Sequence, residues 1–267
     1  MINHLSASQI NLYLQCGLKY RYQYIDMFPK PFRPSALLFG SALHSTLAWF
    51  HEERMKGNSI TLEKLYRIFD ADWYSQRIDV NIRFKEGEKE ANLLNLGREM
   101  LTIFFQEEHP KIKGCEIPFT VPLRSPDGGP DLEIALEGYF DLIEEDDWIV
   151  EYKTSATTLS SSDIDSRLQL TAYSYAYPLL YRKPPKGIRV IDFVKGKKPK
   201  IVVLETKRDE NDHLGFLHTA QEVLKGIKAG IFIPHQSFIC KECEYADICP
   251  LMKNKATSAI GESLYAA

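Results

Sequence analysis

The stretch "GYFDLIEEDDWIVEYKTS" (residues 138–155) consists of two apolar runs separated by an acidic tip, "EEDD". Short apolar runs with a polar connection between them predict a β-hairpin. Asp141 interrupts the first run and Glu151 stands near the end of the second, so antiparallel pairing would place the two carboxylates together. Because side chains alternate along a strand, Glu151 and Lys153 share one face and Tyr152 lies on the other.

Two interpretations of these charged residues remain open from the local pattern. Neighbouring carboxylates repel each other unless a cation lies between them, and hard oxygen ligands suit Mg²⁺ or Mn²⁺. Lys153 could then hold a water or stabilise charge that builds on a phosphate. In the other interpretation, Asp141 belongs to a turn, and Glu151 and Lys153 form an exposed ion pair worth at most about 1 kcal/mol.

The segments around the hairpin predict a central sheet. The first strand of this hairpin belongs to the apolar run 131–146, and another apolar run, 116–123, precedes it across the turn-forming "SPDGGP". Together with residues 148–154, these runs predict a meander of three strands. Two more strands, 188–194 and 200–207, are joined across "KGKKP". We therefore expect five strands in a central sheet.

Helices are expected on both sides of these strands in the sequence. Ser6 or Ser8 can cap a first helix, and Asn211 a last helix over residues 211–229. Apolar spacing predicts further helices over residues 37–56, 61–79, 88–108 and 163–181. The first part of the chain is then all helical and the fold is α/β, with helices flanking the sheet. Residues 255–267 are expected to form a poorly ordered tail.

Length and charge set broad limits. The chain has 267 residues, 44% of them hydrophobic, enough for one large domain or two small ones. The net charge of -3 gives no global attraction to nucleic acid, so polyanion binding would need a local basic surface. No run approaches the roughly 18 apolar residues of a membrane span, and the first residues lack a signal-peptide pattern. We therefore expect a cytoplasmic protein that does not contact a membrane.

The aromatic and basic stretch "KYRYQY" (residues 19–24) has two interpretations. It could contact the backbone and bases of a single nucleic acid strand. Alternatively, it forms a helix with a solvated Lys19 and Arg21 edge and buried tyrosines.

The cysteines predict a metal site rather than disulfides. Five is an odd number, and three of them form the pattern C-x2-C-x5-C in "CKECEYADIC" (residues 240–249). A zinc ribbon usually has two close pairs of ligands, whereas here one close pair accompanies two single cysteines. Four unrelated free thiols remain the alternative. The five residues are Cys16, Cys115, Cys240, Cys243 and Cys249.

The pair "GYFDLIE" and "IVEYKTS" resembles the core motif of the PD-(D/E)xK nuclease superfamily. Four other motifs fall in the order seen in RecB-like exonucleases with an iron-sulfur cluster, a group that includes CRISPR-associated nucleases and the nuclease domain of AddAB-type helicase-nucleases. These motifs are "SASQINLYLQC" (6–16), "FGSALHSTL" (39–47), "RLQLTAYSYAY" (167–177) and "CKECEYADIC". The resemblance spans almost the full length of the chain.

The resemblance implies roles for individual residues. The metal ligands would be Asp141, Glu151, His44 and the carbonyl of Tyr152. Lys153 would be the catalytic lysine, and Gln169 and Tyr173 would orient substrate or the attacking water. Glu151 departs from the more frequent aspartate of the family, which bears on the preferred metal. Glu116 corresponds to an acidic position that some members have before the core motif.

The resemblance also implies an architecture and a second cofactor. We expect a restriction-endonuclease-like core within a single nuclease domain, residues 1–255, that has a helical portion (36–110), a catalytic sheet (111–205) and a cluster-binding segment (235–252), followed by a flexible tail (256–267). Cys16, Cys240, Cys243 and Cys249 would hold a 4Fe-4S cluster that staples the two ends, removing roughly 5 kcal/mol of chain entropy. Cys115 would be a buried structural thiol.

The predicted function is Mg²⁺- or Mn²⁺-dependent hydrolysis of DNA by an exonuclease acting on single-stranded ends, in DNA repair and recombination or in CRISPR adaptation. A helicase or CRISPR adaptation proteins would then be partners. The alternative is a catalytically silent DNA-binding or scaffold subunit of such a complex. A third possibility keeps the nuclease fold and replaces the cluster with zinc.

Overall fold

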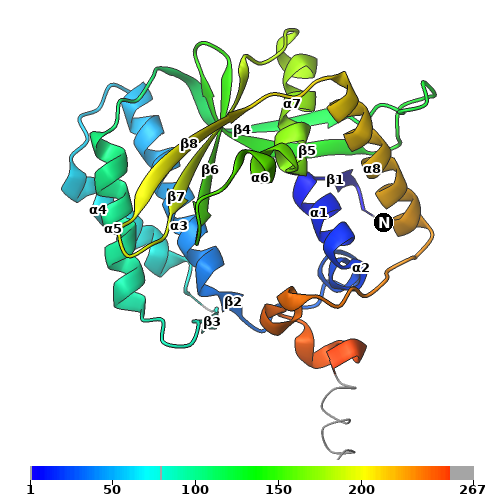
Figure 1. The fold of residues 1–267 in the computed structure, drawn as a ribbon, viewed down its shortest axis with the longest axis horizontal. Helices are drawn as coiled ribbons and strands as arrows, with labels where there is room; N and C mark the ends of the chain where they lie inside the picture. The colour runs from blue at the N-terminus through cyan, green and yellow to red at the C-terminus, as the bar shows by residue number, and fades with distance from the viewer. Residues whose placement is uncertain (1, 79, 253–267) are drawn as a thin grey trace, which may run out of the picture.

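A six-stranded mixed sheet forms the centre of the protein (Figure 1). The computed structural model describes residues 2–78 and 80–252. The central strand is β5, which is antiparallel to β4 and β6 and parallel to β1. Beyond β6 the sheet continues with β7, which is parallel to β6, and ends with β8, which is antiparallel to β7. The strands are β1 (His4–Leu5), β4 (Ile112–Pro122), β5 (Ala135–Glu144), β6 (Trp148–Ser155), β7 (Gly187–Val194) and β8 (Lys200–Thr206). A separate two-stranded sheet pairs β2 (Arg33–Pro34) with β3 (Ile82–Arg83).

The two edges of β5 are used differently. Strand β4 pairs along the whole of one edge, so β1 and β6 share the other. On that edge β1 pairs with Ala135–Leu136 and β6 pairs with Leu142–Ile143. In the described structure, residues 137–141 between them have no strand partner on this side. This open edge is where the sheet can admit a ligand.

Helices cover both faces of the sheet (Figure 1). One face packs against α3 (Ser35–Met55), α4 (Leu62–Ser75) and α5 (Glu90–Gln106), and the other against α1 (Ala7–Gln15), α6 (Ser161–Asp165), α7 (Leu168–Tyr181) and α8 (Glu210–Lys228). Each face has its own apolar core; Leu142 and Val150 belong to the first, and Phe140 and Ile149 to the second. The short helix α2 (Gly17–Tyr20) continues into a π-helical turn, Arg21–Ile25.

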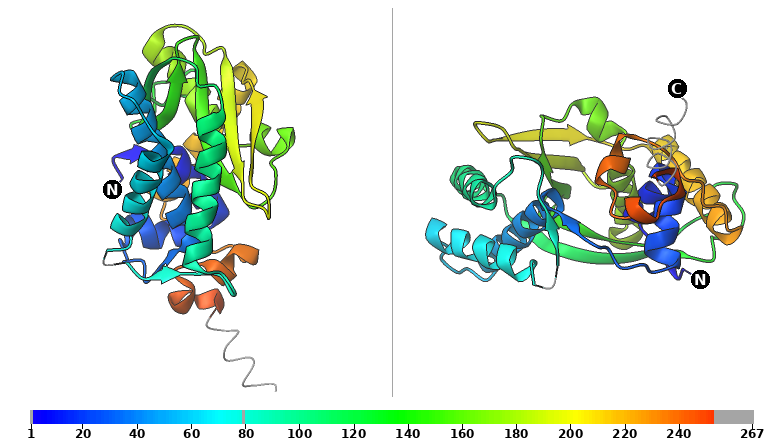
Figure 2. Two further views of the ribbon diagram at one scale, coloured as in Figure 1. Left: turned by 90° about the vertical axis from the view of Figure 1, so that its left-hand side faces the viewer. Right: turned by 90° about the horizontal axis from the view of Figure 1, so that it is seen from below.

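The N-terminal and C-terminal segments pack against each other below the sheet (Figure 2). The hydroxyl of Tyr13 donates to the carbonyl of Ile231 at 2.5 Å, and that of Tyr245 donates to the carbonyl of Phe28 at 3.1 Å. Two short 3₁₀ turns, Phe238–Glu242 and Ala246–Ile248, carry the C-terminal segment past α2. The ends of the fold are therefore joined by direct contacts.

Most of the predicted elements are present. The meander of three strands and the two later strands are confirmed, as are the helices over residues 37–56, 61–79 and 88–108, although the second of these ends at Ser75. Ser6 caps α1 by accepting from the backbone N–H of Gln9, whose side chain accepts in return from Ser6. An α/β fold with helices flanking a mixed sheet is thus the observed architecture.

Three local predictions are wrong. The single helix over 163–181 is two helices, because Ser160 caps the short α6 and the extended backbone of Arg167 (ψ 113°) starts α7. Asp209 rather than Asn211 caps α8, since its carboxylate accepts from the backbone N–H groups of Asn211 and Asp212. The first part is not all helical, because it contains the short strands β1, β2 and β3.

Two further predictions concern the limits of the chain. The expected tail over 255–267 lies outside the described residues. Across the described residues, every helix is too short or too polar to pass through a membrane.

Candidate active site

The candidate site lies where β5 and β6 separate. Their ladder pairs Leu142 with Val150, and one more step in the same register would place Asp141 opposite Glu151. At this step the backbone N–H of Tyr152 donates instead to Oδ2 of Asp141, at 2.9 Å. The aspartate side chain therefore takes the place of a ladder acceptor, and the strands diverge beyond it.

A backbone irregularity on the other side of β5 adds a third carboxylate. Glu116 lies between the ladder pairs Cys115–Leu142 and Ile117–Phe140, opposite Asp141, with a left-handed φ of 47°. Left-handed backbone is uncommon for a residue with a long side chain, and such outliers are frequent at functional sites. The unusual backbone of Glu116 thus lies at the same level of the sheet as the point where β5 and β6 separate.

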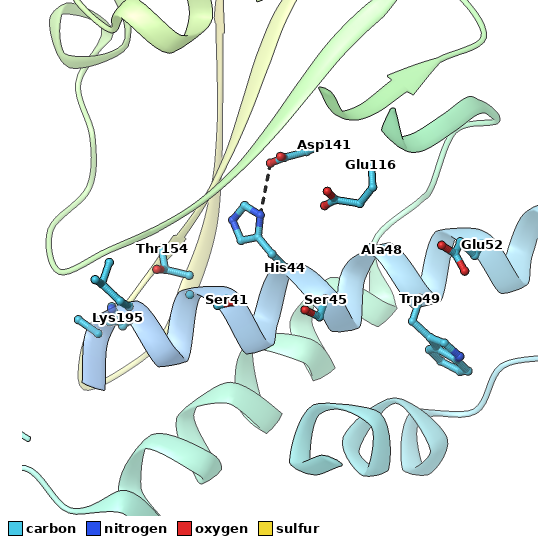
Figure 3. Close-up of a pocket in the computed structure, with 13 residues that line it drawn as sticks. Ser41, His44, Ser45, Ala48, Trp49, Glu52, Glu116, Asp141, Thr154 and Lys195 are labelled. Atoms are coloured by element: carbon cyan, nitrogen blue, oxygen red, sulfur yellow. Dashed lines mark ion pairs between the residues drawn. The ribbon is translucent and has the colours of Figure 1, made fainter. Parts of the chain in front are cut away.

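Helix α3 supplies the histidine of this site. Nδ1 of His44 is 3.5 Å from Oδ2 of Asp141, and His44, Glu116 and Asp141 each offer a ligand atom within 4.8 Å of the others (Figure 3). Burial lowers the pKa of His44, which keeps its ring neutral and able to donate a lone pair to a metal. This is a candidate acidic metal site.

Glu151 and Lys153 reach the same region from β6. The carboxylate of Glu151 is only 1% exposed and forms an ion pair with Lys153. Nζ of Lys153 donates to Oε1 of Gln169 at 2.8 Å, and Nε2 of Gln169 donates to the hydroxyl of Tyr173 at 2.8 Å. The lysine is thus oriented by a hydrogen-bonded chain that begins on α7.

Burial and a neighbouring like charge raise the pKa values of two of the carboxylates. The pKa of Asp141 is well above its ordinary value, first because it is buried and then because Glu151 carries a like charge. Burial and the charge of Glu151 also raise the pKa of Glu116. Burial, followed by the charges of Glu151 and Asp141, raises the pKa of Tyr173. A divalent cation among these groups would remove the repulsion, so the donor set fits such an ion.

Two cavities open onto Asp141. The larger, about 860 Å³, runs along α3 and is lined by His44, Glu52 and Glu116, with Thr154 and Lys195 near the N-terminal end of that helix (Figure 3). The second, about 360 Å³, lies at the open edge of β5, between the start of α1 and α7. Its lining includes Tyr139, Asp141, Gln169 and Tyr173. The candidate metal site is therefore accessible from both faces of the sheet.

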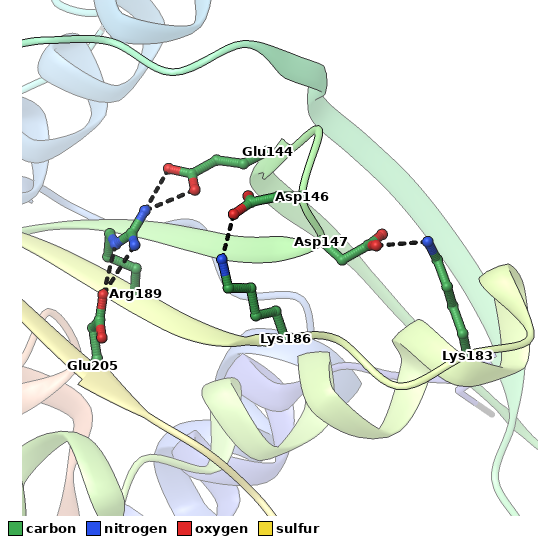
Figure 4. A network of polar contacts seen from close by, with 7 residues as sticks. All are labelled: Glu144, Asp146, Asp147, Lys183, Lys186, Arg189 and Glu205. Atoms are coloured by element: carbon green, nitrogen blue, oxygen red, sulfur yellow. Dashed lines mark hydrogen bonds and ion pairs between the residues drawn. The ribbon is translucent and has the colours of Figure 1, made fainter.

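A polar network fixes the turn at the other end of the hairpin (Figure 4). Asp147, with a left-handed φ of 72°, pairs with Lys183 at 2.6 Å, and Arg189 binds both oxygens of Glu144. The charges of Lys113 and Lys183, acting through hydrogen bonds, hold the pKa of Asp147 well below its usual range. These contacts hold β5 and β6 in the register that brings Asp141 to Glu151.

Comparison with known proteins identifies the family. The model of the PD-(D/E)XK nuclease superfamily matches residues 4–250. The chain belongs to this superfamily. A crystal structure from Eubacterium rectale, of a protein named as a candidate exonuclease, matches with a TM-score of 0.58 and 15% identity over 91% of this chain and 88% of that one. The protein SSO0001 matches with a TM-score of 0.40 and 13% identity over 91% and 96% of the two chains. No curated protein matches.

Membership and fold agree with the mixed sheet described above, which is consistent with a restriction-endonuclease-like core. Nucleases of this superfamily use divalent metals and act on DNA. The residues of the predicted nuclease site, His44, Asp141, Glu151, Tyr152, Lys153, Gln169 and Tyr173, all lie around the point where β5 and β6 separate.

The structure also brings the four cysteines of this superfamily member together. Cys16, at the C-terminal end of α1, lines a small cavity with Cys240, Cys243 and Cys249. The backbone N–H of Ser237 donates to Sγ of Cys240 at 3.4 Å. Among residues 2–78 and 80–252, no three of these sulfur atoms lie within 4.8 Å of one another. Cys115 lies elsewhere, where burial raises its pKa to about 11 and its thiol donates to Ala48.

The "KYRYQY" stretch agrees with the second of its two interpretations only in part, because Tyr20 is buried but the Lys19 side chain is not solvated. Tyr20 is fully buried in the core beneath the sheet, and Nζ of Lys19 pairs with the buried Glu244 at 2.5 Å. Arg21 pairs with Asp26. Its nucleic acid contacts are therefore not supported, because these side chains are occupied in packing.

Several residues of the site were not found from the sequence. Glu52 lies eight residues after His44, two helical turns along the same face of α3, and this spacing was the available signal. Tyr139 precedes Asp141 by two residues. Lys195 begins the turn after β7, and only the fold brings it to the cavity of α3.

Proposed function

We propose that the protein is a Mg²⁺- or Mn²⁺-dependent DNA nuclease that removes nucleotides from single-stranded ends. The observation that carries this proposal is the convergence of the Asp141 and Glu116 carboxylates on the neutral ring of His44, with the like charge of Glu151 nearby and an oriented lysine beside them. Superfamily membership supports a nuclease, and the name of the E. rectale neighbour, whose fold is similar, supports an exonuclease.

In this proposal Asp141, Glu151, His44 and the carbonyl of Tyr152 bind the metal. Glu116 joins them because its carboxylate lies in the same tight group as His44 and Asp141. A bound divalent ion supplies Lewis acidity and lowers the pKa of water. The neutral ring of His44 and the anionic oxygens of the carboxylates then face the ion, while repulsion among the carboxylates falls.

The remaining residues act on the phosphate and the water. Lys153 donates hydrogen bonds through its ammonium group, which stabilises negative charge on a phosphate oxygen. Gln169 holds that ammonium in place through the 2.8 Å bond to its side-chain oxygen. Tyr173 keeps its proton at neutral pH, because its pKa is raised, and it orients Gln169 as a hydrogen-bond partner. These hydrogen bonds support the catalytic roles that the motifs imply for Lys153, Gln169 and Tyr173.

We also propose that Cys16, Cys240, Cys243 and Cys249 hold a 4Fe-4S cluster. All four cysteines line one cavity, and Sγ of Cys240 accepts a hydrogen bond from the backbone N–H of Ser237, as is common around iron-sulfur clusters. A tetrahedral zinc site with bonds of 2.3 Å would bring the sulfur atoms about 3.8 Å apart. A zinc ribbon usually supplies its sulfur atoms as two close pairs of cysteines, whereas this chain has one close pair and two single cysteines. Anaerobic purification should give a brown protein containing iron and sulfide, whereas zinc would give a colourless one.

The biological setting belongs to the same proposal. We propose a single nuclease domain over residues 1–255 that works with a helicase in DNA repair or recombination, or with CRISPR adaptation proteins. The competing function is a silent DNA-binding or scaffold subunit, and activity measurements separate the two.

The test is digestion of end-labelled single strands with Mg²⁺ or Mn²⁺. Wild type is compared with Asp141→Asn, Lys153→Met and the control Asp146→Asn, which changes an exposed residue of the hairpin turn. The first two variants should lose at least about 100-fold in rate, as expected for removing charge stabilisation, and the control should not. Equal rates in all four proteins would refute the catalytic assignment, and DNA binding without any cleavage would support the silent subunit.

A further inference from the structure

Tyr139 of β5 is an exposed aromatic residue whose contacts within the described residues do not explain its ring. Its side chain is 57% exposed, although the neighbouring Phe119 and Phe140 are buried in the core with Tyr173. Across the strands it faces the exposed Pro118. In the part of the chain that the structure describes, its hydroxyl makes no hydrogen bond and its ring packs on no other aromatic ring. Tyr139 therefore contributes little to the stability of the core.

The position of Tyr139 connects it to the candidate site. Tyr139 and Asp141 line the same cavity of about 360 Å³, together with Gln169. Two residues along a strand are about 7 Å apart, which is comparable with one nucleotide of an extended strand. Among the described residues, no strand pairs with this part of β5 on the edge that β1 and β6 share, and the cavity there gives a ligand space beside Tyr139 and Asp141.

Charges nearby indicate which part of a nucleotide lies there. Glu137 lines the cavity beside Tyr139, and its carboxylate is 3.6 Å from the ring of His4. A carboxylate repels phosphate, whereas the flat face of a tyrosine ring attracts a base. The Lys153 ammonium, by contrast, donates to Gln169, which lines the cavity together with Asp141. A nucleotide is thus favoured with its phosphate at Asp141 and Lys153 and its base at Tyr139.

We propose that Tyr139 is the platform on which an unpaired base next to the scissile phosphate stacks, and that it makes the enzyme select single-stranded or frayed ends. This inference rests on the proposed nuclease function and names a residue that determines its specificity. A base must leave its duplex partner to lie on a protein ring, so a paired end gains nothing from Tyr139. Because every base has an aromatic face, the selection is for strand state and not for sequence.

The test combines protein variants with abasic oligonucleotides. Tyr139→Ala should reduce kcat/KM on single strands by about tenfold, mainly through KM, and Tyr139→Phe should restore it. When an abasic residue is scanned along the strand, it should lower the kcat/KM of wild type by about tenfold at one position only. At that position it should not lower the kcat/KM of the alanine variant any further. Blunt duplex ends should respond little. Tyr74→Ala, which removes a 52% exposed tyrosine from α4, is the control.

Several outcomes would overturn this inference while leaving the nuclease function intact. One such outcome is a Tyr139→Ala variant that cleaves as wild type does, and another is a variant that loses activity equally on intact and abasic strands. If the alanine variant does not fold, the abasic scan of wild type decides. The inference is then overturned if wild type cleaves every abasic strand as fast as the intact strand. If wild type cleaves nothing, the proposed function fails, and fluorescence anisotropy of the same strands decides instead: equal affinities of wild type and Tyr139→Ala refute the platform.

Discussion

Asp141 combines two roles that a single carboxylate seldom has. Its Oδ2 accepts the backbone N–H of Tyr152, which completes the sheet, while its charge lies against Glu151 in a buried setting. The hydrogen bond stabilises the fold, and the buried like charge destabilises it. The protein without metal therefore carries an electrostatic cost at this residue that it would lose on binding a divalent cation.

This balance leads to a prediction for Asp141→Asn. The amide oxygen of asparagine still accepts from Tyr152, but the repulsion with Glu151 disappears. In EDTA the variant should be more stable than wild type, by about 1 kcal/mol, although it loses nuclease activity. Thermal unfolding with and without Mg²⁺ checks this. Wild type should gain stability with Mg²⁺ and the variant should gain much less; an equal gain in both would contradict the assigned ligand.

A second prediction concerns pH and His109. Burial, followed by the charge of Arg54, lowers the pKa of His109 to about 4 from its ordinary 6.5. Between these two values the unfolded chain binds the proton and the folded protein does not, so stability falls as pH decreases from 6.5 to about 4. The same direction holds for His51, whose pKa burial lowers to about 3.

Replacing the imidazole ring of His109 should reduce the dependence of stability on pH. His109→Phe places an apolar ring beside Phe50 and Phe104, so the loss of unfolding free energy between pH 6.5 and 4 should shrink by up to about 3 kcal/mol. Urea unfolding at a series of pH values measures it. The exposed His218→Gln is the control and should follow wild type. A His109→Phe profile that is as steep as that of wild type would refute the assignment.

At the residue scale, the sequence predicts those parts of the site that follow strand period. Asp141, Glu151 and Lys153 lie where alternation in a hairpin places them. Tyr139 and Lys195 could not be found this way, because their relation to the site depends on an unpaired edge and on a turn brought in by β7. The left-handed backbone of Glu116 gives no signal in a sequence either, since glycine is absent from that position.

At the scale of elements, periodicity identifies the long helices and the longer strands of the central sheet, but not the short elements or the interruptions. The break between α6 and α7 depends on Ser160 and Arg167, which are compatible with a continuous helix in the sequence. Strand β1 is two residues long and forms only because β5 offers a free edge to it. Elements whose existence depends on a distant partner are those that local patterns miss.

The contact between α4 and α5 leads to a third prediction. Gly97 of α5 lies against the ring of Phe69 of α4 so closely that a β-carbon would overlap it. Gly97→Ala should destabilise the protein by about 1–3 kcal/mol, which exceeds the gain of up to about 1 kcal/mol in helix propensity. Gly215→Ala in α8 meets nothing within 4 Å and should stabilise by that propensity alone. Chemical denaturation of both variants tests the prediction, which fails if they shift stability in the same direction.

At the scale of the whole molecule, the four cysteines and the contacts of the two ends act together. Cys16 shares its cavity with three cysteines more than two hundred residues later, and Lys19 pairs with the buried Glu244 beside them. The order of the motifs in the sequence predicts which cysteines lie together. It does not predict the ion pair between Lys19 and Glu244, because these residues are far apart in the sequence. Breaking a buried pair by removing one partner costs several kcal/mol.

The fourth prediction compares two cysteines of different surroundings. Cys16→Ser should lose most of the bound iron and lower the unfolding temperature of anaerobically purified protein by about 10 °C, because the long loop is no longer closed. Cys115→Ser lies in the other core, where its hydroxyl can still donate to Ala48, and should keep its iron. Iron analysis and thermal unfolding of both variants check this. Equal iron content in the two proteins would refute the cluster assignment.

The contacts between the ends also constrain how the chain is made. Tyr13 bonds to Ile231, and Tyr245 bonds to Phe28, so synthesis must reach residue 245 before the first helices make both of these contacts. Until then the ring of Tyr20, buried in the finished protein, is exposed to water and to other proteins in the cell. Premature termination before residue 231 therefore leaves the amino-terminal helices without their support, and such fragments should be degraded rather than act as uncontrolled nucleases.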